Sequence, residues 1–241
     1  MKSNFYEVFS KKKILLGMLH LAGNGHFEKL ERVAQEIRIY SERGFDGAIV
    51  EDYHGNIINV ADALEYLSQT NHGLIIGVNI LRKPLLSFEM ADRYGVKFVQ
   101  FDTIQASAGD GDNPRKFNEK EYMLLRKKYP NICVLGGVRF KYIPSTGNSL
   151  EDDLTDGMYK SDAIVTTGPG TGIETPTQKL RDFRKIMGDF PLIAGAGVND
   201  KNITEQIEIV DGVVMGSYLK NYDTETQIQE ERVRKIVNLA R

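Results

Sequence analysis

Two glycine-rich segments near the end of the chain have the composition of phosphate-binding loops. The segment LIAGAGVNDKN (192–202) places Gly195 and Gly197 directly after an apolar run, and GSYLK (216–220) follows the next apolar run. Glycine tolerates unusual dihedrals and lets a ligand approach the backbone closely. Backbone N–H groups at such positions attract anions. We therefore predict that Gly195, Gly197, Gly216 and Ser217 bind a phosphate, the alternative being that these glycines only make tight turns.

A third glycine-rich segment, TTGPGTGIETP (166–176), follows another apolar run. Its glycines Gly168 and Gly170 are added as phosphate-binding candidates, because loops at this position in α/β proteins often carry function. A purely turn-forming loop is the alternative. Lys220, just after the last glycine-rich segment, either adds positive charge to the phosphate site or points into solvent.

Side chains suited to proton transfer end several other apolar runs. His20, Glu51 and Asp102 are predicted catalytic residues that act as general acid or base. Neighbours on a strand point to opposite sides, so only one of Glu51 and Asp52 is expected to face the site. Two carboxylates from different strands also suit Mg²⁺, which makes magnesium a candidate cofactor. No spacing selects a metal-ligand set, so none is predicted.

Asn79 and Lys141 complete the predicted catalytic set, because they can stabilise negative charge that develops during the reaction. A lysine at a barrel mouth can instead form a Schiff base when its pKa is depressed. Electrostatic binding is favoured, because that is the ordinary behaviour of lysine near anions.

Eight apolar runs alternate with longer segments of helical periodicity. The runs are continuous rather than alternating, which is typical of strands covered on both faces. This order predicts an α/β fold, a (β/α)8 TIM barrel in which residues 1–241 form a single domain and ligands bind at the carboxyl ends of the strands; an open doubly wound sheet is the alternative. The expected strands are 14–20, 47–52, 74–80, 97–102, 132–138, 162–168, 191–197 and 211–217.

Composition excludes several classes of protein. The net charge of −2 without a basic stripe argues against nucleic acid as a partner. No run of apolar residues reaches the length of a membrane span, and a single cysteine, Cys133, fits a reducing cytoplasm.

A homo-oligomer paired through outer helices is a further expectation. The loop TIQASAGDGDNP (103–114) is long enough to act as a lid.

Several phrases together resemble the BtpA/SgcQ family of barrel proteins. They are GMLHL (17–21), GFDGAIVED (44–52), IGVNILR (76–82), DAIVTTGPGTG (162–172), GAGV (195–198) and DGVVMGSYLK (211–220). The resemblance implies a barrel of the ribulose-phosphate-binding type. His20, Glu51, Asn79 and Lys141 match the family pattern by position. Asp52 and Tyr142 depart from it, since the family usually has asparagine and histidine there, and AGNGHFEKL replaces a proline-rich segment.

Three functions follow from these observations. The first is an enzyme acting on a phosphorylated sugar or nucleotide-like small molecule by isomerase, epimerase or lyase chemistry. The second is a non-catalytic biogenesis or assembly factor for a membrane protein complex, as the family name implies; it would need an exposed apolar patch, and no helix is expected to be apolar on its outer face. The third, a metal-dependent hydrolase, depends on the carboxylates alone.

Overall fold

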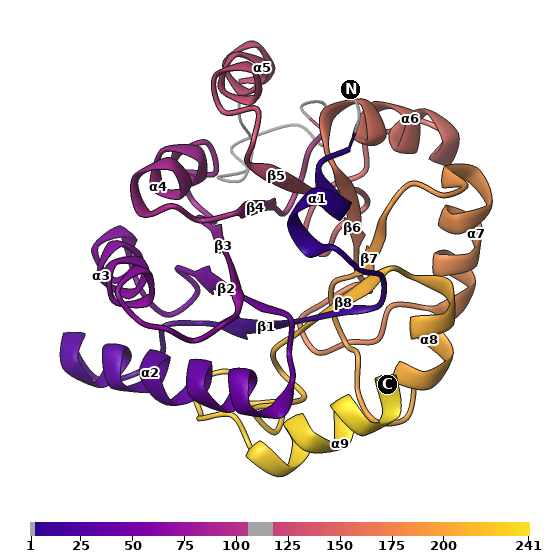
Figure 1. Cartoon of the computed structure of the whole chain (residues 1–241). Coiled ribbons are helices and arrows are strands. Elements are labelled where there is room, and N and C mark those ends of the chain that lie inside the picture. The colour runs from indigo at the N-terminus through magenta and orange to yellow at the C-terminus, as the bar shows by residue number, and fades with distance from the viewer. Residues whose placement is uncertain (1–2, 106–117) are drawn as a thin grey trace.

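The computed structural model describes residues 3–105 and 118–241 and contains eight parallel strands closed into a barrel (Figure 1). Each strand pairs with the next, and β8 closes the ring on β1, with Gly212 opposite Ile14. The predicted TIM barrel is confirmed, and the open doubly wound sheet is wrong. The strands are β1 Ile14–Leu19, β2 Gly47–Glu51, β3 Ile75–Asn79, β4 Phe98–Phe101, β5 Cys133–Gly137, β6 Ala163–Thr166, β7 Leu192–Ala194 and β8 Gly212–Met215.

All eight strands lie inside the predicted apolar runs, and their burial explains why those runs are continuous. Every strand residue is buried except Ile75, which is half-buried. One face of each strand packs against the surrounding helices in the larger core, and the other face fills the inside of the barrel. Burial on both faces is the usual state of strands in parallel sheets.

The helices surround the barrel and bury one stripe each. In α2, for example, Val33, Ile37 and Tyr40 are buried, and the helix ends at Gly44, whose φ of 86° is left-handed. That is the conformation in which glycine commonly ends a helix. The helices are α1 Phe5–Phe9, α2 His26–Arg43, α3 Ile57–Ser68, α4 Leu86–Tyr94, α5 Glu119–Lys128, α6 Leu150–Lys160, α7 Thr177–Met187, α8 Ile203–Ile209 and α9 Glu230–Ala240.

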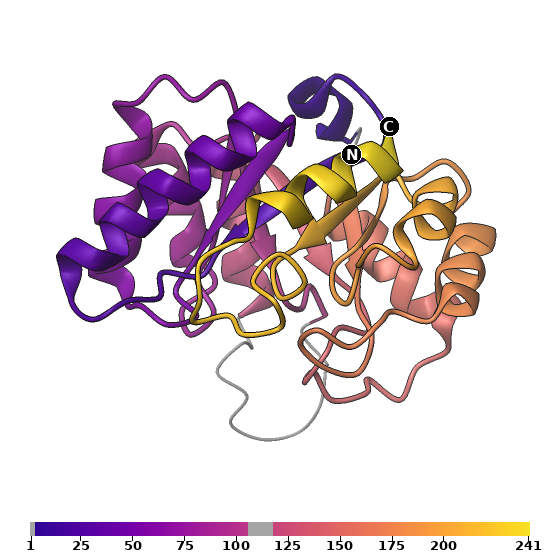
Figure 2. The same cartoon turned by 90° about the horizontal axis from the view of Figure 1, so that it is seen from below.

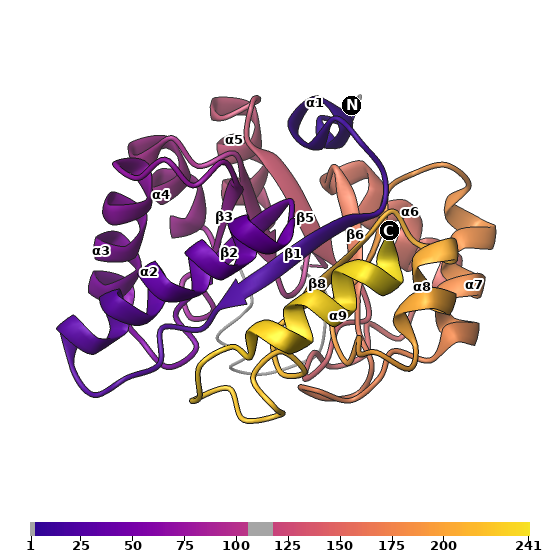
Figure 3. The same cartoon turned by 60° about the horizontal axis from the view of Figure 1, so that its bottom comes forward.

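Helix α1 is an addition to the strict alternation expected from the sequence. Phe5 and Phe9 are buried among side chains of the barrel interior, and the ring of Phe9 lies 5.3 Å from that of Phe98. Figures 2 and 3 show α1 at the end of the barrel where the strands begin, with the long loops at the opposite end. The apolar face of α1 therefore closes the amino-terminal end of the barrel.

Most of the loop expected to act as a lid, residues 106–117, lies outside the described residues. Within residues 3–105 and 118–241, no helix has both the length and the apolar character needed to cross a membrane.

Candidate functional site

One pocket at the carboxyl ends of the strands brings most of the predicted site residues together. Asn79 does not line the pocket itself, but it forms hydrogen bonds to two residues that do, Glu51 and Asp102. Gly168 and Gly170 are not among the residues that line it; Thr171 and Gly172 of the same loop are. The predicted residues that line the pocket are His20, Glu51, Asp102, Lys141, Gly195, Gly197, Gly216 and Ser217.

The two predicted carboxylates are bridged by an amide. Asn79, at the end of β3, donates from Nδ2 to Glu51 Oε1 at 2.9 Å and to Asp102 Oδ1 at 3.0 Å. All three side chains are buried. The side chain of Asp52 is directed elsewhere, because its Oδ1 accepts a hydrogen bond from the Leu81 N–H at 2.7 Å. Glu51 therefore faces the site and Asp52 does not, as alternation along the strand requires.

The Asn79 bridge affects how well the Glu51 and Asp102 carboxylates could bind a magnesium ion. Among the residues that the structure describes, no three His, Cys, Asp or Glu side chains are placed to hold a metal ion together. The Asn79 amide hydrogens already occupy the space between the two carboxylates. A carboxyl pair bridged by a hydrogen-bond donor suits proton transfer or binding of substrate hydroxyls better than it suits a cation.

His20 is buried and lines the same pocket as this carboxyl pair. Burial, followed by the charges of Lys220, Lys141 and His54, holds the pKa of His20 well below its usual 6.5. Its Nδ1 is buried and has no hydrogen-bond partner in the described part of the chain. His20 is therefore a neutral imidazole near neutral pH, able to give or take a proton once a ligand partners its ring nitrogens.

Like His20, Gln100 has a buried polar atom with no hydrogen-bond partner in the described part of the chain. It is buried, lines the same pocket, and its Oε1 also has no donor among the described residues. A buried acceptor of this kind usually has a partner, so a hydroxyl or amine of a ligand is a suitable donor.

The predicted phosphate loops provide fewer free amides than expected. The Gly195 N–H donates to Thr166 O at 2.8 Å, as part of the pairing of β7 with β6, so this amide is not available to an anion. The N–H groups of Gly197, Gly216 and Ser217 have no acceptor in the described part of the protein. Binding of phosphate at these three amides remains a prediction.

Gly197 can only be a glycine. Its φ is 68°, and a Cβ there would lie 2.3 Å from the carbonyl of Ile173. The close packing of the β6 and β7 loops therefore requires the bare backbone at this position.

Lys220 neither faces solvent nor lines the pocket. It is fully buried, and its Nζ forms an ion pair with Glu36 of α2, which is also buried. Its own N–H donates to the carbonyl oxygens of Gly216 and Ser217. The ion pair thus ties the loop with the free amides to α2. Glu36 could have been found from the sequence, because it lies on the same helical face as Val33, Ile37 and Tyr40.

Aromatic side chains at the rim were not predicted. Tyr53, Tyr218 and Tyr222 line the pocket together with the predicted residues. The pocket that they help to line has a volume of about 40 Å³, well below the ~300–1,000 Å³ of ordinary small-molecule sites. A ligand of the size of a sugar phosphate therefore requires the rim side chains to move apart.

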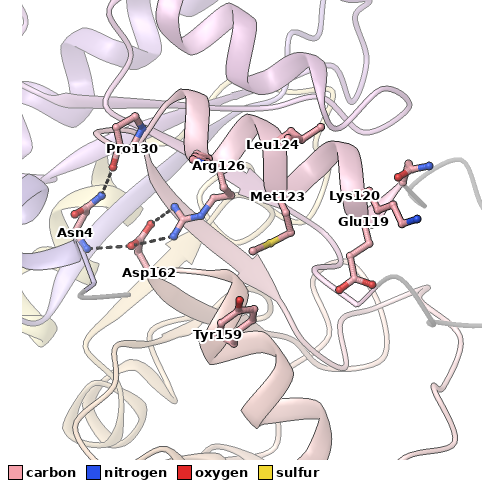
Figure 4. A pocket seen from close by; sticks show the side chains of 11 residues that line it. Asn4, Glu119, Lys120, Met123, Leu124, Arg126, Pro130, Tyr159 and Asp162 are labelled. Atoms are coloured by element: carbon pink, nitrogen blue, oxygen red, sulfur yellow. Dashed lines mark hydrogen bonds and ion pairs between the residues drawn. The ribbon is translucent and has the colours of Figure 1, made fainter.

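A larger groove lies between α5 and α6, away from the barrel mouth (Figure 4). Met123, Leu124 and Tyr159 line it, and Leu124 and Tyr159 are 69% and 61% exposed. On the outer face of α5, Leu124 lies among the exposed charged residues Lys120, Glu121, Lys127 and Lys128. At one end of the groove Arg126 forms an ion pair with Asp162 at 2.7 Å. None of the predicted site residues lies there.

The chain is similar in sequence to several proteins along nearly its whole length. It is 26% identical to an uncharacterized protein of Methanocaldococcus jannaschii, covering 95% of this chain and 96% of that protein. It is 22% identical to the photosystem I biogenesis protein BtpA of Synechocystis, covering 91% of this chain and 84% of that protein.

Solved structures share the fold at lower identity. Thiamine phosphate pyrophosphorylase from Pyrococcus furiosus superposes with a TM-score of 0.65 at 13% identity, covering 95% of each chain. N-(5'-phosphoribosyl)anthranilate isomerase from the same organism gives a TM-score of 0.59 at 13% identity, covering 95% of this chain and 98% of that one. Residues 11–241 match the BtpA family as a whole, and the chain belongs to that family.

Proposed function

We propose that this protein is an enzyme that acts on a phosphorylated small molecule of the sugar phosphate or nucleotide type. The observation that carries the proposal is a single pocket in which the free amides of Gly197, Gly216 and Ser217 lie near the buried His20 and the Glu51–Asp102 pair. The two solved structures with the same fold are named for activities on phosphorylated compounds, which supports the choice of ligand.

Each group has a distinct part in this proposal. The amides bind the phosphate and hold the substrate in register. Neutral His20 and one carboxylate exchange a proton with the carbon or oxygen that reacts. Lys141 stabilises the negative charge that develops. Asn79 donates both amide hydrogens to the carboxylates, so it acts by orienting them. Isomerisation, epimerisation and lyase chemistry all use these parts.

A titration with ribose 5-phosphate, with and without Mg²⁺, tests the proposal. A ligand that binds only the folded state raises the melting temperature as its concentration exceeds Kd. Ser217→Glu places a negative charge beside the amides and should abolish the shift, while Ser217→Ala keeps the amide and should retain it. No shift with any phosphorylated sugar or nucleotide, or equal shifts in both variants, would overturn the proposal. A shift only in the presence of Mg²⁺ would favour the metal-dependent alternative.

The assembly-factor alternative has one observation in its favour, the exposed apolar side chains of the groove between α5 and α6. A relative named as a photosystem I biogenesis protein points the same way. An assembly factor needs no small-molecule ligand, so the titration above separates the two functions.

A further inference from the structure

We infer that the substrate carries, besides its phosphate, a planar ring with a negatively charged group, and that this part binds in a second cleft beside the barrel mouth. The inference rests on the proposed function, because the phosphate fixes one end of the ligand. The cleft offers about 810 Å³, within the range of ordinary small-molecule sites. Its lining includes Asp52, Tyr53, Ile58, Arg82, Lys83 and Tyr142.

Tyr53 joins this cleft to the pocket that holds the proposed chemistry, because it lines both. Its ring lies 5.2 Å from the ring of His20 and 4.8 Å from that of His54. A ligand with its phosphate over β7 and β8 and its reacting atoms beside His20 therefore extends along Tyr53 into the cleft. The part of the ligand beyond the reacting atoms is the part that the cleft recognises.

Tyr142 presents an aromatic ring in the cleft and is held there. It is 58% exposed, and its φ of 62° is left-handed, a conformation that a bulky residue adopts only under constraint. Its hydroxyl oxygen accepts the N–H of Thr171 at 3.0 Å, which fixes the side chain across to the β6–α7 loop. Burial does not explain a fixed, exposed aromatic side chain. A flat ligand ring packing on Tyr53 and Tyr142 does.

The charge of the cleft indicates what the ring carries. Arg82 and Lys83 are exposed cations on the loop after β3. The Asp52 carboxylate accepts a hydrogen bond at 2.7 Å from the N–H of Leu81, the residue before Arg82, and so fixes the start of this loop. Arginine binds carboxylate and phosphate groups through paired hydrogen bonds. A ring with a carboxylate or a second phosphate therefore complements both the aromatic and the basic side of the cleft.

Three probes that differ by one feature each test the inference: ribose 5-phosphate, uridine 5′-monophosphate, which adds a ring, and orotidine 5′-monophosphate, which adds a carboxylate to the ring. Calorimetric titration should show an increase in affinity at each step, by about tenfold for the ring, which corresponds to the upper range of an aromatic contact. Tyr142→Ala should remove the gain from the ring, and Arg82→Ala the gain from the carboxylate. Neither variant should change the affinity for ribose 5-phosphate.

Matched controls use groups of the same type outside the cleft: Tyr159→Ala on α6, which removes a ring with 61% exposure, and Arg38→Ala on α2. Both should retain all three affinities. Equal affinities for the three probes in the unmodified protein, or gains that persist in Tyr142→Ala and Arg82→Ala, would overturn the inference while leaving the proposed function standing. If none of the three probes binds, the proposed function fails and the inference falls with it.

Discussion

His20 and Gly216, which follow the neighbouring strands β1 and β8, lie so close together that Gly216 has no room for a side chain. A Cβ built on Gly216 would lie 2.6 Å from His20 Cε1 and 3.1 Å from His20 Nε2. The neutral imidazole of His20 and a backbone amide proposed for phosphate binding are therefore parts of the same site. A glycine at this position keeps the distance between them short.

Gly216→Ala should displace His20 and the loop together. We expect the affinity for ribose 5-phosphate to fall by about tenfold or more, since misplacing one charged hydrogen bond costs ~1.5–3 kcal/mol. Gly170→Ala is the matched control, because a Cβ there would lie 3.0 Å from the end of the flexible Ile173 side chain and in ordinary contact, at 3.4 Å, with the Tyr142 hydroxyl. Isothermal titration of both variants provides the measurement, and an unchanged affinity in Gly216→Ala would contradict the arrangement.

Removal of the Asn79 bridge should destabilise the protein. In Asn79→Ala the buried carboxylates of Glu51 and Asp102 each lose a hydrogen-bond donor. Removing a partner from a buried polar group costs about 1–3 kcal/mol. Urea unfolding should show a loss of this size. A free energy of unfolding equal to that of the unmodified protein would mean that the bridge does not stabilise the fold.

Lys220→Met should strongly destabilise the fold, because it leaves the Glu36 carboxylate buried without its cation. Breaking one half of a buried pair costs about 3–5 kcal/mol. Replacing both partners, Lys220→Met with Glu36→Leu, should recover most of that loss. The exposed pair Lys13–Glu208 is the control, and Lys13→Met should cost at most about 1 kcal/mol. Chemical denaturation measures all three, and similar losses for the Lys220 and Lys13 variants would contradict the role of burial.

The depressed pKa of His20 makes stability fall on mild acidification. Above pH 6.5 the imidazole is neutral in both states; below it the unfolded chain gains a proton that folded His20 does not accept. The free energy of unfolding should decrease by up to about 1.4 kcal/mol per pH unit from this residue. His20→Asn should flatten the slope between about pH 6.5 and 5 more than His72→Asn, whose pKa burial also lowers. Parallel slopes in the unmodified protein and His20→Asn would refute this assignment.

The strands were predictable because burial on both faces leaves a continuous apolar run in the sequence. The polar residues at the ends of those runs marked the mouth of the barrel for the same reason. Helix α1 was not predictable in this way, since Phe5–Phe9 is only five residues long and too short to show helical periodicity.

Contacts within the site depend on geometry that a local pattern does not contain. The point at which β7 stops pairing with β6 decides that the Gly195 amide is used and the Gly197 amide is free. The Asn79 bridge depends on how far β2, β3 and β4 are staggered in the closed ring. The Lys220–Glu36 pair joins residues 184 positions apart, although the buried acid on α2 gave a local signal.

The aromatic side chains of α1 close the amino-terminal end of the barrel. A ligand cannot pass through the barrel, so a ligand that enters at the loop end also leaves there. For the enzyme proposed above, substrate and product would share this one entrance, so analogues of the product should compete directly with the substrate.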